Sequence, residues 1–156
     1  MYPLKFEHIY FEKVWGSQAL STIRDNLPEG DIGESWDVAC HEKAVSTVAN
    51  GKYKGMKLDE LIEQKKDLLL GKELINRKFP LLVKFLSPKE KLSVQVHPDD
   101  KYAMKYEDGE LGKTEAWYIV EAKEGAYIIL GTNGCTKEQF IKATTVTMHG
   151  LIQLEK

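Results

Sequence analysis

The run Leu92-Ser93-Val94-Gln95-Val96-His97-Pro98 decides the fold of this chain, because apolar and polar residues alternate along it. Successive side chains of a β-strand point to opposite faces, so the alternation predicts a strand with its aliphatic residues on one face. Ser93, Gln95 and His97 share the other face, where a hydroxyl, an amide and an imidazole can serve a single polar site.

A second alternating run, Lys113-Thr114-Glu115-Ala116-Trp117-Tyr118-Ile119-Val120, places Lys113 and Glu115 on a common strand face. If the two strands are neighbours, Gln95, His97 and Glu115 converge on one point. Zinc accepts imidazole and carboxylate ligands, so the convergence predicts a metal site. Spacing alone leaves an alternative open, in which the polar face is only the solvated side of an antiparallel sheet.

Short strand-like runs recur along the rest of the chain, at residues 32–39, 44–49, 80–86 and 127–130. Residues 57–70 instead carry leucines at helical spacing, and Gly71 is suited to end that helix. Helices are also expected after Asp99 and after Thr136, where a T-x-x-Q capping box begins. Short alternating strands favour a mainly β fold, a barrel or jelly roll with a helical insertion.

Lys84 interrupts the apolar run 80–86, where a lysine rarely lies without a partner. One interpretation is an edge-strand lysine that blocks aggregation, and the other is a cation aimed into a polar pocket.

Composition is that of a soluble globular protein: of 156 residues, 42% are apolar and 29% charged, and the formal net charge is -2. The charge gives no reason to expect nucleic acid or an anionic membrane as a partner. The first residues lack a charged and then apolar leader, and no apolar run is long enough to cross a bilayer. With only Cys40 and Cys135, we expect a cytoplasmic protein with reduced thiols.

Three segments resemble the type I phosphomannose isomerases, also called mannose-6-phosphate isomerases. They are Gly33-Glu34-Ser35-Trp36-Asp37-Val38; residues 80–86 with the run 92–100; and Gly109-Glu110-Leu111-Gly112-Lys113-Thr114-Glu115-Ala116-Trp117-Tyr118. The resemblance extends from the first residues to about Ala143. It implies a single cupin-like domain over 1–156, a jelly-roll barrel with a helical insertion at about 56–76.

The family interconverts mannose 6-phosphate and fructose 6-phosphate with a divalent metal, usually zinc. The resemblance implies that Gln95, His97 and Glu115 are metal ligands. It implies substrate contacts for the side chains of Trp15, Lys84 and Ser93. Lys113 is the candidate catalytic residue, because a nearby dication would favour its neutral amine, which could then transfer a proton. The alternative for Lys113 is a purely electrostatic role.

Residues 144–156 do not match the family, whose chains continue further, so the barrel is expected to be incomplete at its carboxyl end. His149 is a candidate for a further ligand, and the alternative is an unrelated histidine. Three hypotheses follow: a complete or truncated isomerase, a non-catalytic metal- or sugar-binding cupin module, and a fragment that folds by pairing. Open strand edges would favour a homodimer in the last case.

Overall fold

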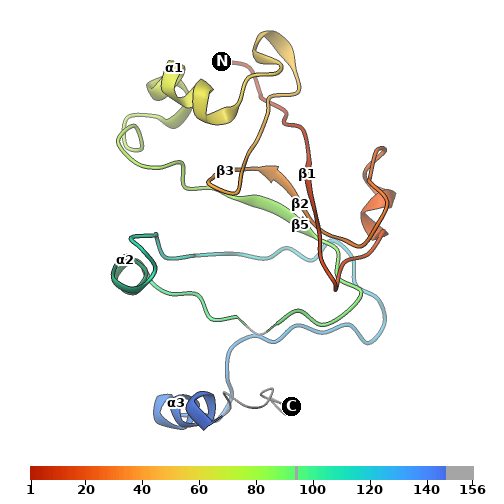
Figure 1. Cartoon of the computed structure of the whole chain (residues 1–156), viewed down its shortest axis with the longest axis vertical. Helices are drawn as coiled ribbons and strands as arrows, with labels where there is room; N and C mark the ends of the chain where they lie inside the picture. Colours follow the sequence, from red (N-terminus) through yellow and green to blue (C-terminus); the bar gives the residue numbers. More distant parts are fainter. Residues whose placement is uncertain (94, 147–156) are drawn as a thin grey trace. The chain divides into compact units, whose positions relative to one another are not determined.

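The computed structural model describes residues 1–93 and 95–146. The chain forms two compact units, residues 1–93 and residues 94–156. Among the described residues, every assigned strand lies in the first unit, and the second unit contains two helices (Figure 1). One domain over 1–156 stays a prediction.

The centre of the first unit is an antiparallel sheet with the strand order β1-β2-β5. Its strands are β1 (Ile9–Glu12), β2 (Ile32–Val38) and β5 (Val83–Leu86), and β2 lies between the other two (Figure 1). A short hairpin follows β2, made of β3 (Cys40–His41) and β4 (Ala44–Val45). The strand predicted at 32–39 is therefore confirmed, and that at 80–86 is confirmed over its last four residues. Of the strand predicted at 44–49, only Ala44–Val45 is assigned as β4.

Strand register sorts the side chains of this sheet onto two faces. Trp36 pairs with Ile9 on one side and with Lys84 on the other, and Glu34 pairs with Phe11 and Leu86. Residues directly opposite one another share a face, and so do residues two apart on one strand. Glu34, Trp36 and Lys84 therefore lie on one face, which we call the Glu34 face.

The opposite face carries a polar cluster centred on Asp37. The carboxylate of Asp37 lies 2.6 Å from the Arg24 guanidinium, and it accepts a hydrogen bond from the Ser35 hydroxyl at 2.8 Å. The imidazole Nδ1 of His8, the residue just before β1, lies 3.2 Å from the Asp37 carboxylate. Burial raises the pKa of nearby Tyr10, and the Asp37 carboxylate adds to this rise, which the Arg24 charge only partly offsets. The ion pair between Arg24 and Asp37 therefore attaches the loop that contains Arg24 to strand β2.

Helical structure in the first unit comprises two short 3-10 turns, Ala19–Thr22 and Gly51–Tyr53, and the helix α1 (Leu58–Leu70). Leu58 and Leu61 of α1 are fully buried, as the leucine spacing predicts. The helix ends at Gly71, whose φ of 72° lies in the left-handed region that glycine tolerates. The helical insertion expected at about 56–76 therefore contains α1.

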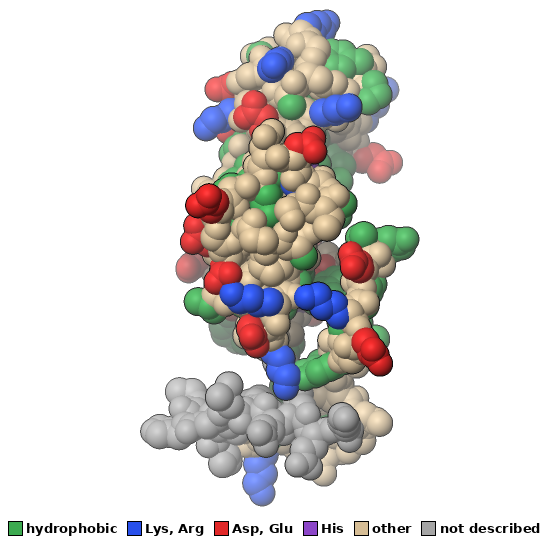
Figure 2. Space-filling view, turned by 90° about the vertical axis from the view of Figure 1, so that its right-hand side faces the viewer, with side chains coloured by type: hydrophobic (Ala, Val, Ile, Leu, Met, Phe, Trp, Pro, Cys, Tyr) green, Lys and Arg blue, Asp and Glu red, His purple; other side chains and the backbone are tan. Residues whose placement is uncertain are grey.

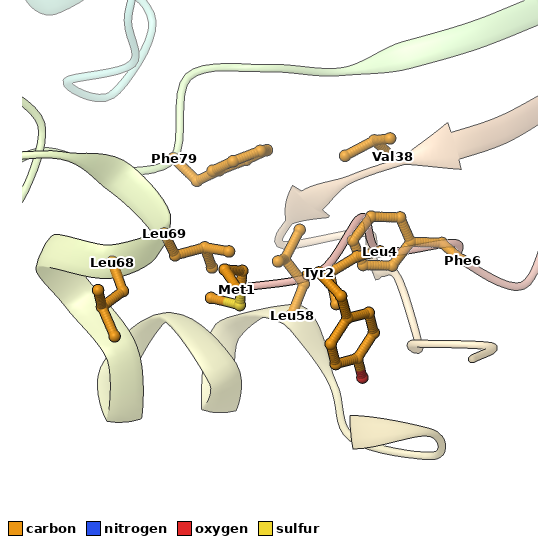
Figure 3. Close-up of a pocket in the computed structure, with 9 residues that line it drawn as sticks. All are labelled: Met1, Tyr2, Leu4, Phe6, Val38, Leu58, Leu68, Leu69 and Phe79. Carbon is orange, nitrogen blue, oxygen red and sulfur yellow. The ribbon is translucent and has the colours of Figure 1, made fainter. Parts of the chain in front are cut away.

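Between α1 and the amino-terminal residues lies an apolar pocket of about 290 Å³ (Figure 3). Its lining includes Leu4, Phe6, Leu69 and Phe79, whose carbon side chains converge in the close-up. Such a lining offers few hydrogen-bond partners to a phosphorylated sugar, so the pocket is a poor candidate for the site that the sequence predicts.

The second unit contains α2 (Asp100–Tyr106) and α3 (Lys137–Val146). Both predicted caps are confirmed. Asp99 accepts a hydrogen bond from the Tyr102 amide at 2.8 Å. Thr136 and Gln139 form the reciprocal pair of a capping box, with bonds of 2.8 and 3.2 Å.

The strands predicted at 92–98, 113–120 and 127–130 are not formed: no described residue of these runs is assigned to a strand. Alternation fixes which face a strand would present, but a strand also needs a hydrogen-bonded neighbour. Large apolar side chains here are exposed, including Trp117 at 56% and Leu130 at 91%. His149 lies outside the described residues.

Some general properties also follow from the described residues. Within residues 1–93 and 95–146, no helix combines the length and the apolar character needed to cross a bilayer. Cys40 and Cys135 are free thiols. Acidic and basic side chains are intermixed on the face seen in Figure 2.

Candidate functional site

Three of the predicted site residues meet in the second unit, which defines the His97 cluster: His97, Lys113 and Glu115. The imidazole Nε2 of His97 lies 3.2 Å from Glu115 Oε1. The Lys113 ammonium lies 2.9 Å from the other carboxylate oxygen and 3.2 Å from the same imidazole nitrogen. His97 and Glu115 therefore lie close together, although neither residue is in an assigned strand, and their role as metal ligands stays a prediction.

A tryptophan that the sequence analysis did not select completes the surroundings of Glu115. The indole of Trp117 donates a hydrogen bond to Glu115 Oε1 at 3.0 Å. Burial favours the neutral acid, but the hydrogen bonds from Lys113 and Trp117 and the nearby charges outweigh it. The pKa of Glu115 is consequently lowered from its ordinary value. Glu115 thus favours the anionic form that a metal ion needs.

The spacing of the two donor atoms fits a shared cation. Zinc binds imidazole nitrogen and carboxylate oxygen at about 2.0–2.2 Å, so two such donors around one ion stand about 3.0–3.5 Å apart. The His97–Glu115 distance of 3.2 Å falls within that interval. The described residues contain no group of three or more His, Cys, Asp and Glu side chains able to hold a metal. An ion at the His97 cluster would therefore need further ligands of another type or source.

The remaining predicted residues to place are Gln95, Ser93 and Trp15. Gln95 is exposed and lies two residues before His97 in the second unit, so its place in the ligand set stays a prediction. Ser93 is exposed at the end of the first unit. Trp15 is half-buried, with its ring against Gly33 of β2. The substrate roles of Ser93 and Trp15 likewise stay predictions.

Lys84 lies on the Glu34 face, where it has a charged partner. Its ammonium is 3.7 Å from the Glu34 carboxylate, and that of Lys13 is 4.0 Å from the same group. The indole of Trp36 donates to Glu34 at 2.7 Å. Lys84 lies on β5, an edge strand of the described sheet, and it also has a carboxylate partner, so both interpretations of Lys84 stay open.

Glu34 was missed as a site candidate, although a signal for it is present in the sequence. The run Glu34-Ser35-Trp36 has the same E-x-W spacing as Glu115-Ala116-Trp117. In both, the tryptophan indole donates to the glutamate two residues earlier, and a lysine lies within 4 Å. Each unit therefore holds a glutamate by the same pair of local contacts, an indole and a lysine ammonium.

Comparisons with known proteins identify the family of this chain. Residues 4–132 match the family described as phosphomannose isomerase type I, catalytic domain. The chain is 45% identical over 137 residues to mannose-6-phosphate isomerase ManA of Bacillus subtilis, covering 88% of this chain and 43% of that relative. It is 43% identical over 138 residues to mannose-6-phosphate isomerase of Streptococcus mutans, with coverage of 88% and 43%.

A solved structure is similar as well. The crystal structure of mannose 6-phosphate isomerase from Bacillus subtilis superimposes with a TM-score of 0.83 at 43% identity, over 92% of this chain and 46% of that one. The chain spans less than half the length of the curated relatives named above. The matched region includes the His97 cluster and the Glu34 face. This chain therefore belongs to the type I phosphomannose isomerase family.

Proposed function

We propose that this chain serves the metal-dependent interconversion of mannose 6-phosphate and fructose 6-phosphate, as a complete or a truncated isomerase. The observation that carries the proposal is the 3.2 Å separation of His97 Nε2 and Glu115 Oε1, with the Lys113 ammonium beside both. The relatives named mannose-6-phosphate isomerase support the reaction and the phosphorylated hexose as substrate.

The reaction moves a proton between C1 and C2 of the sugar through an enediol, and it needs a proton carrier and stabilisation of a charged oxygen. A divalent ion, for which zinc is our choice, supplies Lewis-acid stabilisation of that oxygen when bound. His97 and Glu115 would hold the ion together with the amide oxygen of Gln95. Neither His97 nor Glu115 is then free to act as the base.

Lys113 is the remaining candidate for proton transfer, because its Nζ lies within 3.2 Å of both proposed ligands. The competing role is electrostatic, in which the ammonium orients substrate or balances Glu115. Lys113→Arg separates the two roles, since arginine keeps the charge but does not release a proton. Retained kcat in Lys113→Arg supports the electrostatic role, and loss of kcat with unchanged metal content supports proton transfer.

Three further residues are proposed to contact the sugar phosphate. Lys84 and Ser93 would bind its hydroxyl or phosphate oxygens, and Trp15 would form part of an aromatic wall near the site. The ion pair between Lys84 and Glu34 supports an oriented cation at position 84. We also propose the cupin jelly-roll barrel, with open edges, and a cytoplasmic location. Exposed apolar side chains between 117 and 130 support pairing of copies, because their burial against a second copy would be favourable.

A non-catalytic metal- or sugar-binding module is the second candidate function. It is favoured by one observation: within the described residues, the His97 cluster offers only one imidazole and one carboxylate as ligands. A site short of protein ligands would bind an ion weakly and leave the sugar poorly oriented.

Two measurements separate these functions. Metal content of the purified chain is compared with that of His97→Ala, with His41→Ala as a control histidine outside the cluster. A coupled assay then follows formation of fructose 6-phosphate from mannose 6-phosphate. Bound metal with turnover supports the isomerase, and bound metal without turnover leaves the binding module. Metal content near zero that His97→Ala does not change would defeat both.

A further inference from the structure

Within the second unit, two backbone segments carry the proposed ligands: the histidine segment, residues 97–100, and the glutamate segment, residues 112–115. They are joined by a hydrogen bond in which the Gly112 amide donates to the Asp100 carboxylate at 2.9 Å. A second bond runs between backbone groups, from the Lys113 amide to the Pro98 carbonyl at 3.2 Å. Both bonds lie between the two ligand residues along the chain.

Gly112 allows the two segments to approach at the level of the backbone. A Cβ at this position would stand 2.6 Å from the Asp100 amide nitrogen and 2.8 Å from the Pro98 carbonyl oxygen. These are backbone atoms, so they cannot turn away as the end of a long side chain can. Any side chain at 112 would therefore push the segments apart.

The neighbouring residues Asp99 and Asp100 accept hydrogen bonds from different parts of the second unit. Asp99 caps α2 by accepting from the Tyr102 amide at 2.8 Å. Asp100 is the first residue of that helix, and its carboxylate reaches across to Gly112. A bond from a backbone N–H to a carboxylate is charge-assisted and stronger than a neutral one. The chain therefore separates helix capping from cross-linking of the two segments.

We infer that Asp100 is a positioning residue: its bond to Gly112 sets the distance between His97 and Glu115, and thereby the affinity for a metal ion. The inference rests on the proposed function only for the identity of the ligands. Groups that hydrogen-bond the ligands themselves typically change metal affinity by about 10–100-fold when they are removed, and we take the lower end because Asp100 acts through the backbone of Gly112. The two bonds that hold the segments together form within the chain and do not depend on a bound metal ion.

The test compares three variants of the full chain by titration with Co²⁺, whose d–d absorption reports binding. Asp100→Ala removes the acceptor, and we expect about tenfold weaker Co²⁺ binding. Asp100→Asn keeps an amide oxygen that can accept from Gly112, so it should restore affinity to within about twofold. Asp99→Ala is the matched control, because it weakens the same helix without touching the glutamate segment, and it should also stay within about twofold.

A second measurement, without metal, follows hydrogen exchange of the Lys113 amide, whose own acceptor is Pro98. We expect Asp100→Ala to speed this exchange and Asp99→Ala to leave it unchanged. Equal exchange in Asp100→Ala and the unchanged chain overturns the inference, as does Co²⁺ binding that Asp100→Ala does not weaken. If the unchanged chain binds no Co²⁺ while exchange at Lys113 depends on Asp100, the proposed metal site is wrong. The role of Asp100 in holding the two segments together is then still supported.

Discussion

The Asp37 cluster allows a quantitative prediction about stability. Asp37→Ala removes the partner of Arg24, whose side chain is 12% exposed, and the acceptor for the Ser35 hydroxyl, which is fully buried. The Nε of Arg24 already lacks a hydrogen-bond partner among the described residues, so the variant leaves a mostly buried guanidinium poorly satisfied.

The expected cost follows from these contacts. Breaking a buried ion pair by removing one partner costs about 3–5 kcal/mol. The 19% exposure of Asp37 admits some screening, so we take the lower end, about 3 kcal/mol. Replacing both partners by apolar residues is often near neutral, so Arg24→Met should lower the penalty of Asp37→Ala by about 2 kcal/mol.

Urea unfolding followed by circular dichroism measures these free energies for the two single variants and the double variant. With a slope of about 2–3 kcal/mol per molar urea, Asp37→Ala should lower the midpoint by about 1 M. Asp25→Ala, an exposed acid beside Arg24, is the control for loss of a negative charge. A cost below about 1 kcal/mol for Asp37→Ala, or equal costs in both backgrounds, would refute the reasoning.

Three further predictions concern Gly16, the two cysteines and Glu34. Gly16→Ala would place a Cβ 2.2 Å from a backbone oxygen of the loop before β2. Urea unfolding should therefore show a free energy of unfolding that is lower by about 1–3 kcal/mol. A decrease of less than about 0.5 kcal/mol would contradict the close contact. Burial, reinforced by the charge of a nearby carboxylate, raises the pKa of the Cys40 thiol, so less thiolate is present at a given pH. Mass spectrometry should find that iodoacetamide at about pH 8.5 alkylates exposed Cys135 first, and faster labelling of Cys40 would oppose this. If Lys84 binds the substrate as proposed, Glu34→Gln, which removes the carboxylate partner of Lys84, should raise KM for mannose 6-phosphate about threefold or more with kcat little changed. An unchanged KM would separate Glu34 from substrate binding.

Local signals in the sequence predicted local structure well. Gly71 ends α1, and Thr136 with Gln139 caps α3, because each depends on atoms only a few residues apart. The strand β2 was also predictable, since its alternation coincides with neighbours on both sides. The two helix ends depend only on residues close in sequence, and β2 has both of its partner strands within the same unit.

The remaining strands could not be predicted in the same way. Residues 113–120 alternate as clearly as β2 does, yet they are not assigned to a strand, because alternation does not name a hydrogen-bonded neighbour. His97 and Glu115 were nevertheless expected to meet, and they do so through turns and backbone bonds instead of a ladder. The E-x-W spacing pointed to the contact between Glu34 and Trp36, but the two lysine partners of Glu34, Lys13 and Lys84, lie far from it along the chain and could not be predicted.

The pairing of β5 with β2 makes the length of the chain around Lys84 critical. Side chains of a strand alternate in phase, so inserting or deleting one residue just before position 84 would shift every following side chain to the other side of the sheet. The ammonium would then leave Glu34 and stand beside the Arg24 guanidinium, which lies over the Phe85 ring, so that two cations would repel. Insertions and deletions should therefore be tolerated in the turn region after Gly71 and rejected inside β5.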